Sequence, residues 1–222
     1  MKRQRTLTAC VALVAASVLV AGCGGDDEKS DKADEGKIAG TETTAPAKPS
    51  PTASEAAGEK DGPDLSLPKD LKVVTDWAEP GEADQAGALR DAARFVIGLD
   101  RAIARQDVSD EAYRYYSYPA SNARKAAEEN IKLHVDHDRS VTGIRRLHKE
   151  SMQVVKAHKT VVVQFCVDDQ KYFGKDLKTS KKIEGDSPED AYSKYEIGMV
   201  SVDGKKWVAK ELKATTGDAE CA

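Results

Sequence analysis

The chain has 222 residues, with 34 Lys and Arg against 38 Asp and Glu and a formal net charge of −4. An acidic chain repels the phosphates of nucleic acid, so nucleic acid is excluded as an expected partner. Charged residues make up 32 % of the sequence and aromatic residues only 5 %, which makes a broad aromatic platform for sugars improbable in this chain.

The N-terminus has the three-part layout of a secretory signal. Three positive charges, Lys2, Arg3 and Arg5, precede an apolar run that extends from about residue 7 to residue 21. This run is shorter than the roughly 20 residues that a spanning helix needs, and no positive stop-transfer flank follows it. We therefore predict that residues 1–22 are a signal peptide that is removed.

The signal ends in a lipobox, Val20-Ala21-Gly22-Cys23. Small residues before the cysteine suit a peptidase that cleaves an extended backbone, and the thiol then carries the lipid. Because each buried CH₂ adds about 0.8 kcal/mol, two or three acyl chains such as palmitate hold a protein nearly permanently. The sequence predicts a lipoprotein anchored through Cys23 at the outer face of the cytoplasmic membrane.

A polar linker follows the anchor, over residues 23–69. Its composition is Gly, Asp, Glu, Lys, Ser, Thr, Ala and Pro, with Ile38, Leu65 and Leu67 as its large apolar residues. Such a segment buries too little surface to offset its ordering entropy, so we expect it to be disordered. Loss of residues 1–22 removes three positive and no negative charges, which changes the formal net charge from −4 to −7.

Residues 70–222 are enough for one compact domain, which begins with helices. Apolar residues at helical spacing predict a long helix over residues 81–107. A short tyrosine-bearing helix starts near residue 109 and ends before Pro119, and a third, capped by Ser121 or Asn122, covers residues 123–136.

After Gly143 the apolar pattern changes to a period of two. Four segments rich in Val, Ile, Tyr and Phe predict strands, and Asp203-Gly204 between the last two predicts a tight hairpin. The predicted strands are residues 151–156, 160–168, 192–202 and 206–213. Helices followed by an antiparallel meander indicate an α+β domain with its helices on one face of the sheet.

The cysteines leave one pair for a disulfide. Cys10 leaves with the signal and Cys23 carries lipid, so Cys166 and Cys221 remain in an oxidising compartment. We predict that they pair and that the crosslink stabilises the fold by on the order of 3 to 4 kcal/mol. The alternative is two separate buried thiols.

Several short segments also carry a family resemblance. They are Ala93-Arg94-Phe95-Val96, Arg105-Gln106-Asp107, Tyr116-Ser117-Tyr118-Pro119, Val163 to Asp169, Lys178-Thr179-Ser180-Lys181 and Cys221. Together they resemble small actinobacterial lipoproteins of the NTF2-like (cystatin-like) fold, over most of residues 80–222. The resemblance implies a cone with a pocket between the long helix and a curved antiparallel sheet. Most members have no assigned activity, and Ser117 and Ser121 stand where similar proteins often have cysteines.

Asp100 is the candidate catalytic residue. Ketosteroid isomerases, which share the NTF2-like fold, use a desolvated Asp and a Tyr–Asp oxyanion hole. Here Asp100 would act with Tyr113, Tyr115 or Tyr116, although none aligns to an isomerase motif. The alternative is a solvated or salt-bridged Asp100 with tyrosines at the edge of the core, and the sequence favours this alternative.

His134 and His137 are the candidate metal ligands. A spacing of three brings them to neighbouring positions on a helix, where carboxylates could complete a shell. Capping and solvation at a helix end explain the same residues. No cofactor is expected.

The leading hypothesis is a non-catalytic, surface-anchored domain that binds an envelope protein, another envelope component or a small apolar ligand. The first alternative is a ketosteroid-isomerase-like pocket enzyme without metal. A weaker alternative is a divalent-metal-binding lipoprotein.

Overall fold

The structure is a computed structural model, and it describes residues 52–53, 62–183, 185 and 188–222. The chain separates into two units, Met1–Ala45 and Pro46–Ala222, and all described residues belong to the second. The predicted signal peptide, Cys23 and most of the predicted linker lie outside the described residues. Among the described helices, none combines the length and the apolar composition that a membrane crossing requires.

Three α-helices come first along the folded unit: α1 (Ala83–Arg105), α2 (Glu111–Tyr115) and α3 (Asn122–Asp136). The sequence predicted all three. Helix α1 is capped by Gln106, whose left-handed backbone (φ 57°) turns the chain so that the N–H of Asp107 donates to the carbonyl of Ala102. The side chain of Asp110 caps α2, and the side chain of Ser121 caps α3 by accepting from the N–H of Arg124.

A close approach packs α1 against α2. A Cβ placed on Gly98 of α1 would lie 2.6 Å from the backbone nitrogen of Tyr113. Only glycine leaves room for this contact. Gly98 therefore fixes how near the two helices lie.

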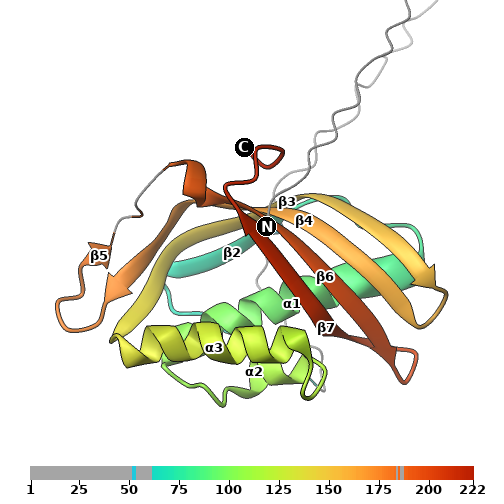
Figure 1. Cartoon of the computed structure of the whole chain (residues 1–222), viewed down its shortest axis with the longest axis horizontal. Helices are drawn as coiled ribbons and strands as arrows, with labels where there is room; N and C mark the ends of the chain where they lie inside the picture. Colours follow the sequence, from blue (N-terminus) through green and yellow to red (C-terminus); the bar gives the residue numbers. More distant parts are fainter. Residues whose placement is uncertain (1–51, 54–61, 184, 186–187) are drawn as a thin grey trace, which may run out of the picture. The chain divides into compact units, whose positions relative to one another are not determined.

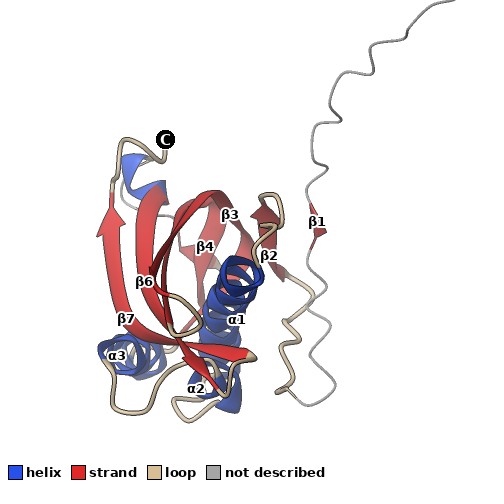
Figure 2. Cartoon of the chain, turned by 90° about the vertical axis from the view of Figure 1, so that its right-hand side faces the viewer, coloured by secondary structure: helices blue, strands red, loops and turns tan. Residues whose placement is uncertain are grey.

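The strands form one mixed sheet in the order β1-β2-β3-β4-β6-β7, with β5 paired to β4. The strands are β1 (Thr52–Ala53), β2 (Leu71–Asp76), β3 (Arg139–Lys156), β4 (Thr160–Asp176), β5 (Lys182–Ile183), β6 (Tyr192–Val202) and β7 (Lys206–Thr216), and a 3₁₀ turn, η1 (Glu189–Ala191), precedes β6. Helix α1 runs along the concave side of this sheet, with α2 and α3 beside it (Figures 1 and 2). The domain is α+β, with its helices on one face of the sheet.

The sheet contains three strands that the sequence did not predict, β1, β2 and β5, and one of its pairings is parallel. β2, which the periodicity did not reveal, lies parallel to β3, whereas every other pair is antiparallel. The expectation of a purely antiparallel sheet was wrong because the three helices form the crossover that parallel strands need.

The predicted strands are otherwise present, and three of them are longer than expected. β3 begins at Arg139 instead of residue 151, β4 continues to Asp176 instead of residue 168, and β7 continues to Thr216 instead of residue 213. The hairpin between β6 and β7 is confirmed, since Asp203 and Gly204 both have positive φ (59° and 75°).

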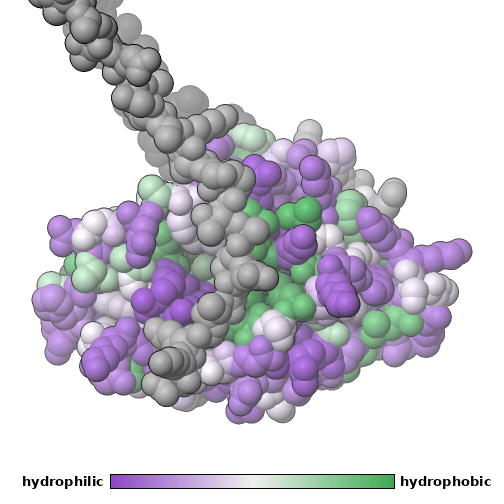
Figure 3. Space-filling model, turned by 180° about the vertical axis from the view of Figure 1, so that it is seen from behind, coloured by the Kyte–Doolittle hydropathy of each residue, from purple (hydrophilic) through white to green (hydrophobic). Residues whose placement is uncertain are grey.

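The hydrophobic core lies between α1 and the sheet, and it includes a residue of the predicted linker. Leu65 is 2 % exposed and packs in the core, so the ordered body starts before the expected boundary at residue 70. Hydrophilic residues cover most of the face seen in Figure 3, with a smaller apolar area near its middle.

Candidate functional site

Asp100 lies in the last two turns of α1, on the side that packs against the sheet, and its side chain is 0 % exposed. Arg145 of β3 donates from Nη1 to Asp100 Oδ1 over 2.6 Å. The hydroxyl of Tyr172 on β4 donates to the same oxygen over 2.8 Å. The sequence left two roles open for Asp100, catalytic and structural. The buried salt bridge to Arg145 agrees with the structural role.

Arg145 joins Asp100 to a second carboxylate. Its Nε and Nη2 donate to Oδ1 and Oδ2 of Asp169, each over 2.9 Å. The guanidinium also lies over the ring of Tyr172, 3.9 Å from the ring centroid. Bidentate, charge-assisted pairs of this kind fix geometry as well as adding energy. We call Asp100, Arg145, Asp169 and Tyr172 the Arg145 cluster.

A β-bulge assembles the Arg145 cluster. Two residues of β4, Asp169 and Gln170, oppose the single residue Arg145 at a break in the register. A bulge shifts the in–out alternation of a strand by one residue. Asp169 within the bulge and Tyr172 after it therefore both face Arg145.

The cluster contains two carboxylates for one guanidinium. Burial raises the pKa of Asp100 from 3.8 to about 6, while the charge of Arg145 and the hydrogen bond from Tyr172 oppose the rise. Burial by itself would lower the pKa of Arg145, but the two carboxylates outweigh it and raise that pKa well above its ordinary value. Asp100 Oδ2 is buried and has no hydrogen-bond partner among the described residues.

This arrangement suits a structural role better than acid–base catalysis. A carboxyl with a pKa near 6 beside a tyrosine has the chemistry of a general acid or base. However, Asp100 has no exposed surface, and Arg145 favours its ionised form, whereas an oxyanion hole needs a protonated carboxyl that donates. The cluster ties α1 to β3 and β4.

The tyrosines that the sequence paired with Asp100 lie elsewhere. The Tyr113 hydroxyl donates to the carbonyl of Val108. Tyr116 packs edge-on against the ring of Tyr115, with centroids 5.0 Å apart. The tyrosine that reaches Asp100 is Tyr172. These three tyrosines do not partner Asp100, because α2 packs against the Gly98 side of α1 while Asp100 faces β3 and β4. The salt-bridged alternative that the sequence favoured agrees with the structure.

Two members of the cluster reach the surface. Asp169 is 24 % exposed, and Asp169 and Tyr172 line an open pocket of about 440 Å³. A pocket of this size is large enough for a small ligand. The solvent-accessible chemistry of the cluster is therefore that of Asp169 and Tyr172.

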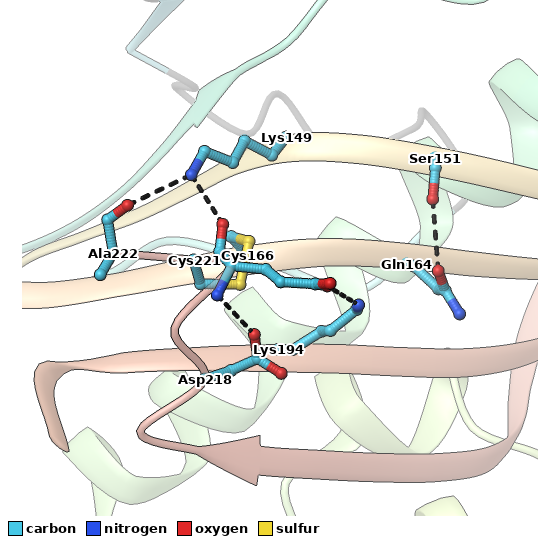
Figure 4. Close-up of a disulfide and its surroundings, with 9 residues drawn as sticks. Lys149, Ser151, Gln164, Cys166, Lys194, Asp218, Cys221 and Ala222 are labelled. Atoms are coloured by element: carbon cyan, nitrogen blue, oxygen red, sulfur yellow. Dashed lines mark hydrogen bonds and ion pairs between the residues drawn. A yellow bond between two sulfur atoms is a disulfide. The ribbon is translucent and has the colours of Figure 1, made fainter. Parts of the chain in front are cut away.

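A disulfide joins β4 to the C-terminal residues. Cys166 and Cys221 are bonded, with their Cα atoms 5.3 Å apart, which is the pairing expected from the sequence. Lys149 Nζ donates to the carbonyl oxygens of Glu220 over 2.8 Å and Ala222 over 3.4 Å (Figure 4). The disulfide and Lys149 together hold the last residues against the sheet.

His134 and His137 lie at the end of α3, as predicted. Their Nδ1 atoms lie 2.9 Å from the carbonyl of Asn130 and 2.8 Å from that of Leu133. A carbonyl only accepts, so each Nδ1 donates and only Nε2 remains for a metal. Within the part of the chain that the structure describes, no three His, Cys, Asp or Glu residues are grouped to hold a metal ion. The hydrogen bonds fit the capping role.

Comparisons with known proteins yield little. No family model and no curated protein matches the chain. Among solved structures, the chain is similar to a "putative ketosteroid isomerase" from Shewanella frigidimarina NCIMB 400, at 8 % identity and a TM-score of 0.32. The alignment covers 56 % of this chain and 94 % of that one. A TM-score this low does not support a fold assignment. The α+β description therefore rests on the helices and strands of the structure.

The sequence reasoning missed Arg145, Asp169 and Tyr172. Arg145 was predicted neither in a strand nor in a site, and Tyr172 lies beyond the predicted end of its strand. One signal was available: Asp168-Asp169 directly follows a mostly buried, apolar strand segment over residues 161–167, and a carboxylate that is partly withdrawn from water favours a cationic partner.

Proposed function

We propose that this protein is a lipoprotein, anchored through Cys23 at the outer face of the cytoplasmic membrane, whose folded unit is a non-catalytic binding domain. The support for the anchor is the signal sequence that ends in Val20-Ala21-Gly22-Cys23. The polar composition of residues 23–69 predicts a linker between the anchor and the folded unit.

We assign the folded unit to the NTF2-like class of folds. A long helix, α1, on the concave side of a curved sheet with two further helices supports this assignment (Figure 1). The shared class carries no activity with it, because one fold hosts many functions.

One observation carries the non-catalytic proposal: Asp100, the candidate catalytic carboxylate, is held inside the Arg145 cluster. Asp100 accepts from Arg145 and Tyr172 and is 0 % exposed. An enzyme of the isomerase type needs its base within hydrogen-bond reach of a substrate. The buried core side chains between α1 and the sheet also favour a partner at the surface, such as an envelope protein, over an apolar molecule inside the fold.

The anchor is tested by metabolic labelling with an alkyne analogue of palmitate. We expect Cys23→Ala to abolish both the label and recovery in the membrane fraction. Cys10→Ala is the matched control, since it changes the other cysteine of the same signal and should leave both unchanged. Label retained in Cys23→Ala would overturn the anchor.

The binding role is tested by cross-linking on intact cells, followed by mass spectrometry. We expect the same envelope neighbour to be captured by the wild type and by Asp100→Asn. The enzymatic alternative is tested on a β,γ-unsaturated ketosteroid by the ultraviolet absorbance of the conjugated product. Turnover by the wild type that Asp100→Asn lacks would refute the non-catalytic proposal.

A further inference from the structure

One end of the sheet carries lysines on its convex face. Lys72 of β2 is paired with Ile144 of β3, and Ile144 is paired with Lys171 of β4. Residues that are paired directly in a sheet point to the same face. Their chain neighbours point the other way, since Leu71 is buried in the core and the hydroxyl of Tyr172 reaches α1. The two lysines and Ile144 therefore face away from the helices.

The same face continues along β4 toward the end of that strand. Phe173 and Lys175 follow Lys171 at steps of two, and the register with β3 is unbroken over this stretch. Lys182 of β5 is paired with Lys175, and its ammonium group lies 4.5 Å from the ring centroid of Phe173. β5 marks this end of the sheet at the left of Figure 1. We call Lys72, Ile144, Lys171, Phe173, Lys175 and Lys182 the lysine face.

Three of the four lysines have no carboxylate partner among the described residues. Lys175 donates to Asp70 over 2.8 Å, whereas Lys72, Lys171 and Lys182 are exposed and form no ion pair in the described part of the chain. Because no described carboxylate neutralises these three ammonium groups, their potentials add at the surface. The lysine face is therefore locally positive, although the chain has a formal net charge of −4.

Ile144 places an apolar group between two of the lysines. Its side chain is 39 % exposed, on the outward face that it shares with Phe173. At the surface of an anionic bilayer, lysines meet the phosphates while apolar and aromatic side chains enter the headgroup region. A soluble polyanion also offers phosphates, but it has no apolar layer to receive Ile144. The composition of the lysine face thus favours a bilayer.

The proposed anchor is connected to the folded unit beside the lysine face. β1 is paired with β2, with Ala53 opposite Val74, and Val74 lies two residues after Lys72 on the same face of the strand. About 28 residues lie between Cys23 and Thr52, and a random coil of that length has a root-mean-square span of about 30 Å. A tether of this kind gives an effective concentration on the order of millimolar, so even a weak contact with the membrane is occupied.

We propose that the lysine face docks the folded unit on the anionic lipid headgroups of the membrane to which Cys23 is anchored. The inference rests on the proposed anchor for its location and on the lysine face for its chemistry. The convex side of the sheet then faces the membrane. The helices on the concave side face away from it, where an envelope partner can reach them.

The test is co-sedimentation of the mature chain carrying Cys23→Ala with lipid vesicles. This variant lacks lipid, so its binding reports the protein surface alone. We expect binding to vesicles of equal parts phosphatidylcholine and phosphatidylglycerol, and no binding to phosphatidylcholine alone. Salt at about 1 M should abolish the binding, because the Debye length then falls to about 3 Å.

Lys72→Gln with Lys171→Gln should lower the vesicle partition coefficient by about 30-fold, since each lysine near an anionic surface contributes about fivefold. Neither side chain makes a hydrogen bond within the described part of the chain, so the fold should persist, which circular dichroism checks. The matched control is Lys156→Gln with Lys159→Gln. It changes the net charge equally at the other end of the β3–β4 pair, and it should bind like the wild type.

Ile144→Thr distinguishes a bilayer from a soluble polyanion. Threonine keeps the branched shape that a strand favours and removes apolar surface. We expect this variant to bind vesicles severalfold more weakly than the wild type and to bind soluble poly(glycerol phosphate) equally well. A wild type that binds this polymer but not the vesicles would overturn the bilayer as the partner.

Absence of vesicle binding by the wild-type surface, or an equal loss in the lysine control, would overturn the inference. The anchor is measured separately, because palmitate-analogue labelling of Cys23 does not depend on the lysine face. A labelled protein whose Cys23→Ala form binds no vesicles rejects the docking and leaves the proposed function standing. Vesicle binding by a protein that takes up no label supports the lysine face and rejects the anchor.

Discussion

The buried carboxyl of Asp100 should make the stability of this protein depend on pH in an unusual direction. Its pKa is about 6 in the folded protein, against 3.8 for an ordinary Asp. Because the folded state holds the proton more tightly, the stabilisation is fully present below pH 3.8 and is lost as the pH rises through about 6. Carboxyl groups in folded proteins more often have a lowered pKa, and these groups lose their stabilising free energy as the pH falls.

The magnitude follows from linkage. One unit of pKa shift corresponds to about 1.4 kcal/mol. The pKa of Asp100 is 3.8 in the unfolded chain and about 6 in the folded protein, and a fall in pH from 7 to 5 covers only the part of this interval that lies above pH 5. Over that interval Asp100 should add about 1 kcal/mol to the free energy of unfolding. No reduction for solvent screening applies, since the side chain is 0 % exposed.

The assay is urea denaturation of the wild type and Asp100→Asn at pH 5, 6 and 7. His148, whose pKa burial lowers, opposes the effect of Asp100, but both proteins contain it and it cancels in their difference. We expect the wild type to gain about 1 kcal/mol relative to Asp100→Asn between pH 7 and pH 5. Parallel stability profiles for the two proteins would refute the reasoning.

Tyr172→Phe is a second variant, and it should move the pH dependence of stability where Asp100→Asn removes it. The Tyr172 hydroxyl donates to Asp100 and thereby lowers its pKa. Removing that donor should raise the pKa of Asp100 further and move the pH dependence to higher pH. A shift to lower pH would contradict the assigned hydrogen bond.

Three further predictions concern stability, each measured by urea denaturation. Gly98→Ala should lower the free energy of unfolding by about 1 to 3 kcal/mol, because its Cβ would meet the backbone of α2. Gly81→Ala is the control and should lower it little, since nothing lies within 4 Å of a Cβ there. Equal losses in the two variants would argue against the close approach of α1 and α2. Replacing both Cys166 and Cys221 by Ser should cost about 4 kcal/mol, as expected for a crosslink over 55 residues. Ser121→Ala should cost about 1 kcal/mol by removing the cap of α3, and Ser121→Thr should retain most of that stability.

The sequence by itself determined the local structure. The helical spacing of apolar residues located α1 and α3, and Asp203-Gly204 located the last hairpin, because helix periodicity and turn chemistry depend on residues within a few positions of one another. The disulfide was predictable for a different reason: the predicted signal peptide and the proposed lipid anchor would take up the other two cysteines, and the bond between Cys166 and Cys221 is present.

Tertiary structure alone decided the parallel pairing of β2 and the Arg145 cluster. β2 lies beside a strand about 70 residues later, and no local pattern specifies such a partner. Arg145 and Tyr172 meet Asp100 across 45 and 72 residues of sequence. The bulge at Asp169 then shifts the alternation of β4, so that strand periodicity read from the sequence points Tyr172 to the wrong face. The candidate catalytic Asp100 was found from its helix, but its salt bridge and its tyrosine came from long-range strand register.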